Sequence, residues 1–233
     1  MSTNDSGLWR NRAAALAFCG NSLLATVHQT GEFGLDPAFW ADFPACESDE
    51  VAAAADACGA FAGAAADRAA AGEDPATDAS VEFTRLFVGP PSPAAAPWET
   101  FYRGANAQAE EGARVGFGEA TVDMQRRLAD AGLQVSNENN QYADHMGIEL
   151  LLASVLCERI ADALEGAAPA ADADSSAAGE PVSDQLAYLD AYLNERPLSW
   201  MADLRAAVEA AAPGGYIARI LALADAMLRA ISA

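Results

Sequence analysis

The chain has 233 residues, of which 52% are hydrophobic, so it can bury one sizeable core in a single domain. It carries 34 acidic residues against 13 basic ones, all of them arginine, and its formal net charge is −21. Because such a charge repels phosphate backbones and anionic lipids, the composition argues against nucleic acid and membrane surfaces as partners and favours a cationic ligand.

Apolar residues recur at helical spacing along nearly the whole chain, while strict alternation is scarce, so the predicted fold class is all-α. Gly89-Pro90 is expected to end one helix, and Gly132 is expected to cap another. The predicted helices, in chain order, cover about residues 8–30, 37–43, 47–72, 78–88, 109–132, 142–165, 183–194, 198–211 and 215–231. The clearest apolar stripe lies on the helix over residues 142–165 and comprises Met146, Leu150, Ala153, Cys157, Ile160 and Leu164.

Residues 166–182 are small, acidic and proline-bearing, which predicts a flexible loop within one domain over residues 1–233. Such a segment also permits domain swapping, so we expect either a monomer or a domain-swapped dimer. The sequence has no apolar run long enough to cross a membrane and no recognisable export signal, so we expect a cytoplasmic protein without stable membrane insertion. GC-rich coding also produces an alanine-rich, lysine-free composition, so much of the acidity is general rather than a specific patch.

Neither the cysteines nor the glycines form a motif that holds a metal or a nucleotide. The cysteines lie far apart with no histidine pair beside them, which predicts buried free thiols. A phosphate loop follows a strand and ends in Gly-Lys-Ser/Thr. Neither feature accompanies Gly112, Gly116 and Gly118, so these glycines do not indicate a phosphate loop. We therefore expect no metal and no cofactor. The four cysteines are Cys19, Cys46, Cys58 and Cys157.

A stiff aromatic segment, "RLFVGPPSPAAAPWETFY" at residues 85–102, interrupts the helical pattern. Its prolines fix the backbone, while Trp98, Phe101 and Tyr102 supply rigid apolar faces with polar edges. Such a wall suits peptide binding because little entropy is lost when the wall is already rigid. The alternative is that Trp98 simply fills the core.

Two pairs of polar residues are candidates for chemistry. Asp144 and His145 open the amphipathic helix, where an aspartate is first of all an N-cap. A hydrolase that used His145 with Asp144 would need a nucleophile or a metal, and the sequence contains neither GxSxG nor HExxH. Glu82 and Arg85 lie three residues apart on one predicted helix, a spacing that by default gives a surface ion pair.

Taken together, three segments in this order resemble a known family. The first, Glu-x-x-Arg-Leu-Phe-x-Gly-Pro leading to Pro-Trp-x-x-x-Tyr, is formed by Glu82, Arg85, Leu86, Phe87, Gly89, Pro90, Pro97, Trp98 and Tyr102. The second, an Asp-His followed by a glycine and leucines, is formed by Asp144, His145, Gly147, Leu150, Leu151 and Leu152. The third, a Leu-x-Pro-Trp turn, is formed in part by Pro197, Leu198 and Trp200. Over residues 81–228 the chain thus resembles the TorD/DmsD/NarJ family of redox-enzyme maturation chaperones, and it departs from the family pattern at Gln141-Tyr142-Ala143 and at Ser199.

The resemblance implies a non-enzymatic helical bundle of the TorD/DmsD-like type that binds the twin-arginine signal peptide of a molybdenum-cofactor oxidoreductase and delays export until the cofactor is loaded. The expected partner is the twin-arginine leader, the folded body of a molybdopterin-dependent reductase, or both. We expect the proline-aromatic loop and the Asp144-His145 helix start to line one groove. The residues that the resemblance assigns to signal-peptide binding are Glu82, Arg85, Leu86, Phe87, Gly89, Pro90, Pro97, Trp98, Tyr102, Asp144 and His145.

Two alternatives accompany this hypothesis. A NarJ-like chaperone would assemble a non-exported molybdoenzyme subunit rather than bind an export leader. A hydrolase built on Asp144 and His145 is the alternative from a different class of function, and a stoichiometric metal or cofactor in the purified protein would favour it.

Overall fold

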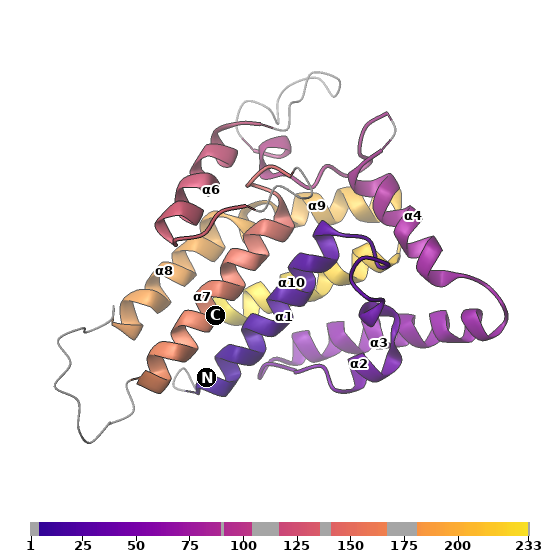
Figure 1. Ribbon diagram of the computed structural model, residues 1–233, viewed down its shortest axis with the longest axis horizontal. Helices are drawn as coiled ribbons and strands as arrows, with labels where there is room; N and C mark the ends of the chain where they lie inside the picture. The colour runs from indigo at the N-terminus through magenta and orange to yellow at the C-terminus, as the bar shows by residue number, and fades with distance from the viewer. Residues whose placement is uncertain (1–4, 90, 104–116, 136–140, 167–180, 233) are drawn as a thin grey trace.

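A computed structural model describes residues 5–89, 91–103, 117–135, 141–166 and 181–232, and within these ranges the chain forms helices and no β-strand (Figure 1). The predicted all-α class is therefore confirmed. One continuous hydrophobic core runs through the bundle. The elements are α1 (Ser6–Leu24), η1 (Phe33–Leu35), α2 (Pro37–Ala41), α3 (Asp49–Ala70), α4 (Pro75–Phe87), η2 (Glu99–Phe101), α6 (Glu119–Asp130), α7 (Met146–Gly166), α8 (Val182–Glu195), α9 (Pro197–Ala211) and α10 (Tyr216–Ser232).

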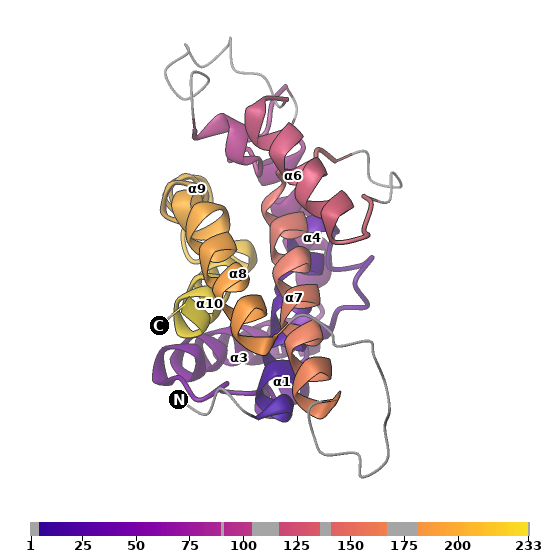
Figure 2. The same cartoon turned by 90° about the vertical axis from the view of Figure 1, so that its left-hand side faces the viewer.

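The centre of the bundle is the pair α1 and α7, which lie side by side along most of their lengths. Helix α10 packs against α1, α3 and α9, and α8 packs against α7. Figure 2 shows α8, α9 and α10 together on one side of the α1–α7 pair, with α6 and η2 at one end of the molecule. The proline-aromatic loop and the start of α7 meet at the same end of the molecule.

Close approach of α1 and α7 depends on two glycines that face each other. A Cβ atom on Gly147 would lie 2.7 Å from the carbonyl oxygen of Gly20, and a Cβ atom on Gly20 would lie 2.8 Å from the carbonyl oxygen of Gly147. Both distances are shorter than a van der Waals contact with backbone allows, so only glycine permits this helix spacing.

Several predicted helix boundaries were wrong, each for a local reason. Helix α1 ends at Leu24 rather than near residue 30, because Thr26 donates from its backbone N and its Oγ1 to Oε1 of Gln29 and leads into turns. Helix α4 begins at Pro75 rather than near residue 78, since Asp74 caps it and proline suits a first helical turn. Residues 109–116 of the helix predicted over 109–132, and most of the flexible loop predicted at 166–182, lie outside the described residues.

Other boundaries follow the sequence. Helix α4 ends just before Gly89, whose φ of 95° is accessible mainly to glycine. Gly132, with φ 69°, follows the end of α6 as predicted. All four cysteines are free and buried, as expected, and burial raises the pKa of Cys46 to about 11 and that of Cys157 to about 12. Among the described helices, none is long and apolar enough to cross a membrane.

Candidate functional site

The structure brings the proline-aromatic loop and the start of α7 together. The backbone N of Met146 donates to the carbonyl oxygen of Pro97 at 2.9 Å, and the backbone N of Glu99 donates to the carbonyl oxygen of Asp144 at 3.0 Å. Trp98 and His145 form an isolated antiparallel bridge, with their rings 6.1 Å apart and edge to face. Two segments more than 40 residues apart in sequence therefore form one surface at this end of the bundle.

Asp144 lies beneath this surface and not on it. Its side chain is buried, and its carboxylate accepts hydrogen bonds from the backbone N of Thr100 at 3.0 Å, from Oγ1 of Thr100 at 2.6 Å and from Oγ1 of Thr121 at 2.8 Å. These bonds tie α7 to η2 and to α6. Since the carboxylate is enclosed by its own donors, it is not available in this structure for direct contact with a signal peptide, the role that the resemblance assigned to it.

His145, not Asp144, caps α7. Its Nδ1 accepts a hydrogen bond from the backbone N of Gly147 at 3.0 Å, which leaves the ring proton on Nε2. Complete burial lowers the pKa of His145 to about 3, so the ring is neutral. It lies edge to face against both Trp98 and Phe87. The cap was predicted for Asp144, but that side chain is held by the two threonines.

Glu82 and Arg85 connect α4 to the turn between α9 and α10. Oε1 of Glu82 accepts from the backbone N of Ile217 at 2.9 Å, in the first turn of α10, and Nη2 of Arg85 donates to the carbonyl oxygen of Ala211 at 3.0 Å, at the end of α9. Burial raises the pKa of Glu82 despite these backbone donors. A carboxylate at a helix N-terminus and a guanidinium at a C-terminus both suit the helix dipoles, so this pair stabilises the helix turn. It is not the surface ion pair that the spacing suggested.

We expect Glu82→Ala to lower the free energy of unfolding by about 1–2 kcal/mol, because it removes an N-terminal cap of α10. A Cβ atom on Gly215 would lie 2.2 Å from Oε2 of Glu82, so Gly215→Ala should displace the same cap. The two losses should therefore not add in the double variant. Urea unfolding of the four proteins measures this coupling, with Glu82→Gln as a control that keeps an acceptor oxygen. Full additivity would show that Glu82 does not cap α10.

The remaining residues of the first signature are mostly internal. Leu86 and Phe87 are buried in the core, and the loop folds back so that the backbone N of Ala95 donates to the carbonyl oxygen of Leu86 at 2.9 Å. Tyr102 stacks on buried Trp200 with ring centroids 5.4 Å apart. Pro97 is buried, Gly89 permits the turn into the loop, and Pro90 lies outside the described residues. These residues therefore hold the loop in its conformation by packing within the protein.

An aromatic row does reach the surface, and two of its members were missed by the sequence analysis. Trp98 contacts Tyr142 with ring centroids 6.0 Å apart, and Tyr142 contacts Phe117 at 5.9 Å. Tyr142 is 42% exposed and Phe117 is 50% exposed. The Nε1 atom of Trp98 is buried and donates to no acceptor among the described residues. The only sequence signal for Tyr142 was its place in the departure from the family pattern. We call Trp98, Tyr142 and Phe117 the aromatic row.

A shallow pocket of about 390 Å³ adjoins the row at the start of α6 and is lined by Phe117, Gly118, Glu119, Val122, Asp123 and Arg126. Glu119 is exposed, and no basic residue within the described ranges pairs with it. Val122 is 54% exposed. The pocket thus combines apolar surface with a carboxylate that pairs with no basic residue in the described part of the chain.

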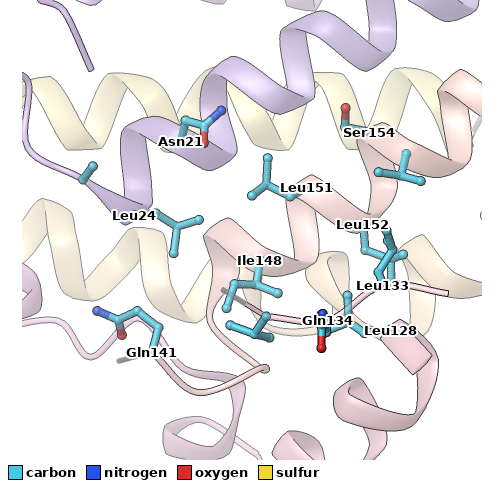
Figure 3. Close-up of a pocket in the computed structure, with 13 residues that line it drawn as sticks. Asn21, Leu24, Leu128, Leu133, Gln134, Gln141, Ile148, Leu151, Leu152 and Ser154 are labelled. Carbon is cyan, nitrogen blue, oxygen red and sulfur yellow. The ribbon is translucent and has the colours of Figure 1, made fainter. Parts of the chain in front are cut away.

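An aliphatic groove of about 480 Å³ lies between α1, α7 and the segment after α6 (Figure 3). Its walls are mainly leucine, isoleucine and valine, and among the described residues none that lines it is charged. Oε1 of Gln141 is buried at its edge and accepts from no donor among the described residues. The residues that line the groove are Asn21, Leu24, Ala25, Leu128, Leu133, Gln134, Val135, Gln141, Ile148, Leu151, Leu152, Ser154 and Val155.

Below the aromatic row, a polar network links η2, α6, α7 and the α8–α9 junction. Nη1 of Arg196 donates to both oxygens of Glu99, at 3.2 and 3.1 Å, and the same guanidinium pairs with Asp123. Close to Glu99 lies the fully buried carboxyl of Glu149, whose Oε2 accepts from Nε1 of Trp200 at 3.0 Å and whose Oε1 has no hydrogen-bond partner among the described residues. None of these acids was singled out in the sequence, although Glu149 within "MGIELLL" is an acid in an apolar run.

Comparison with known proteins gives one match. A family model described as nitrate reductase delta subunit matches residues 46–206, which is more than half of the chain. The matched range includes the aromatic row, the proline-aromatic loop and most of the polar network. No curated protein and no solved structure matches the chain.

Proposed function

Since the chain belongs to the nitrate reductase delta subunit family, whose members are redox-enzyme maturation chaperones that assist the assembly of molybdoenzymes, we propose that it binds the twin-arginine leader of its molybdoenzyme at the aromatic row. The leader is held until the cofactor is loaded, which delays export. The chain itself catalyses no reaction in this proposal.

The aromatic row is the observation that carries the proposal. Large apolar side chains rarely gather on a surface without a partner, and Tyr142, Phe117 and Val122 are all about half exposed beside Trp98. The orphan Nε1 of Trp98 has no acceptor within the described residues and suits a backbone carbonyl oxygen of a bound peptide. Rigid aromatic side chains are also favoured as anchors of interfaces.

The chemistry of the two neighbouring pockets fits the two parts of such a leader. A guanidinium is recognised by aromatic faces together with a carboxylate, as Phe117 and Glu119 offer at the start of α6. The apolar segment that follows the arginines in a leader suits the uncharged aliphatic groove between α1 and α7. The net charge of −21 speeds the encounter with a basic peptide.

We expect Trp98→Ala to weaken leader binding by about 2 kcal/mol, or about thirtyfold in Kd, because it removes the largest aromatic side chain of the row. Tyr142→Ala should weaken it by about 1 kcal/mol. Isothermal titration of a synthetic twin-arginine leader peptide measures both. Tyr188→Ala is the matched control, since Tyr188 on α8 is 41% exposed against 42% for Tyr142. Equal affinity of all four proteins would remove the aromatic row from the binding site.

The proposed contact between Glu119 and an arginine of the leader can be tested against a second exposed carboxylate. Glu119→Gln and Asp67→Asn each remove one exposed negative charge, but only Glu119 lines the pocket beside Phe117. Glu119→Gln should therefore weaken binding of the leader peptide, and the difference should vanish for a peptide in which glutamine replaces both arginines. An equal effect of the two substitutions would reduce Glu119 to a contributor to net charge.

The description of the matching family favours a second candidate function, the assembly of a non-exported catalytic subunit of nitrate-reductase type. The same groove would then hold an apolar segment of that subunit. Affinity purification of the chaperone from its own cells separates the two: recovery of a precursor with an arginine pair in its leader supports the first, and recovery of a leaderless catalytic subunit supports the second.

A further inference from the structure

The carboxyl group of Glu149 is fully buried, and its Oε1 has no hydrogen-bond partner among the described residues. It lies close enough to the buried carboxyl group of Glu99 for the two to interact electrostatically. Two neighbouring buried carboxylates, one of them with an oxygen that no donor reaches, are costly to keep charged, so one of the two groups carries a proton. Both side chains are buried, and Glu149 is completely so. The proton is therefore part of the folded structure.

The partners of each group show which one holds the proton. Glu99 faces the guanidinium of Arg196 with both oxygens, an arrangement that favours the charged form. Glu149 has only a neutral donor, Nε1 of Trp200 on its Oε2, and no basic group donates to its Oε1. Burial, and then the charge of Glu99, raise the pKa of Glu149 well above its usual range. Of the two carboxyl groups, Glu149 therefore carries the proton.

We propose that Glu149 is a positioning residue that holds a proton in the folded protein, and that this proton keeps η2, and with it Trp98, in place against α7. Glu99 follows Trp98 directly in sequence, and its backbone N donates to the carbonyl oxygen of Asp144. If Glu149 loses its proton, two buried negative charges face each other beside Asp144, and η2 is repelled from α7. The effect on peptide binding rests on the proposed function, whereas the location of the proton does not.

Within the described part of the chain, the charged and titratable groups that face the pair come from the elements packed against it. On η2 and the turn before α7 these are Glu99 and Asp144, both acidic. Helix α8 contributes Tyr192, whose hydroxyl donates to the carbonyl oxygen of Glu149 at 2.8 Å and whose pKa burial raises well above its usual range. The α8–α9 junction contributes Arg196, the one cation among the described residues that acts on the pair. On α6, Asp123 forms ion pairs with both Arg196 and Arg127.

The sign of the pH dependence follows from the raised pKa of Glu149. Above its ordinary value of 4.5 the unfolded chain releases this proton while the folded chain keeps it, so the wild type loses stability as pH rises, until the folded pKa is passed. Glutamine keeps an oxygen for Trp200 and the shape of a protonated carboxyl group, but it cannot ionise. The ratio of the unfolding constants of wild type and Glu149→Gln should therefore grow by up to about tenfold per pH unit above pH 4.5.

Infrared spectroscopy of the folded protein tests the proton directly. The wild type should show the C=O stretching band of a protonated carboxyl group at neutral pH, and the band should be lost in Glu149→Gln. Glu99→Gln is the matched control: it removes the negative charge and one of the two oxygens that face Arg196 and should destabilise the protein at all pH values. A band that survives in Glu149→Gln, an unchanged pH dependence of unfolding, or failure of Glu149→Gln to fold would each overturn the assignment.

The link to binding is measured separately. Leader-peptide affinity of the wild type should fall at alkaline pH, while that of Glu149→Gln should stay constant. If the infrared band behaves as expected and neither protein binds the peptide, the proton assignment stands and the proposed function fails. If both proteins bind with the same pH dependence, Glu149 holds a proton but does not position the aromatic row.

Discussion

Asp144→Ala is expected to lower the free energy of unfolding by about 3 kcal/mol, the upper value for hydrogen bonds to a charged group. Its carboxylate accepts from the backbone N and Oγ1 of Thr100 and from Oγ1 of Thr121, and all of these atoms are buried. Removal of the side chain leaves three donors unpaired between η2, α6 and α7. Chemical denaturation followed by circular dichroism measures the loss.

Two further variants make this expectation specific. Asp144→Asn keeps one acceptor oxygen and should lose only about 1–2 kcal/mol, whereas Asp67→Ala, at an exposed position on α3, should change the stability by less than about 0.5 kcal/mol. An Asp144→Ala variant that is as stable as the wild type but no longer binds the leader peptide would contradict this structural role. It would show instead that the carboxylate contacts the peptide directly.

Gly147→Ala is the second substitution with a large expected effect, a destabilisation of about 1–3 kcal/mol from overpacking. The new methyl group would lie 2.6 Å from Cγ of Leu24 and 2.7 Å from the carbonyl oxygen of Gly20, and backbone in the middle of a helix pair cannot move aside cheaply. Thermal unfolding should show a lower midpoint, and the start of α7 should shift beneath the aromatic row.

The chain offers a matched control for this glycine. Gly63 also lies within a helix, α3, and a Cβ atom there would meet no atom within 4 Å. Gly63→Ala should therefore stabilise the protein by about 0.5–1 kcal/mol, as expected for glycine to alanine in a helix. If Gly147→Ala destabilises the protein and Gly63→Ala stabilises it, close helix packing is the cause of the destabilisation at Gly147. Destabilisation by both would point to a general intolerance of substitution.

Local patterns predicted the helices well, because apolar residues at helical spacing form one face of the helix, and that face is buried in the core. The stripe from Met146 to Ile160 is buried as expected, and Gly89 and Gly132 end their helices. The predicted end of α1 was wrong because two hydrogen bonds from Thr26 to the side chain of Gln29 redirect the chain. Apolar periodicity contains no information about such a bond.

The signature residues were found by their spacing, but their partners are far away in sequence. Glu82 bonds a residue 135 positions later, and Asp144 bonds threonines 44 and 23 positions earlier. Sequence therefore marked these positions while leaving open whether they face a peptide or the protein itself. Tyr142 and Phe117 were missed for the converse reason, since nothing in one sequence distinguishes an exposed aromatic from a buried one.

The burial of all four thiols has a practical consequence for the stability experiments. A thiol-specific alkylating reagent needs an exposed thiolate, and burial suppresses both exposure and ionisation of these cysteines. Alkylation therefore reports the fraction of molecules that open. The rate of labelling can rank the stabilities of Asp144→Ala, Gly147→Ala and Glu149→Gln at low protein concentration and without denaturant, and the native cysteines serve as the probes.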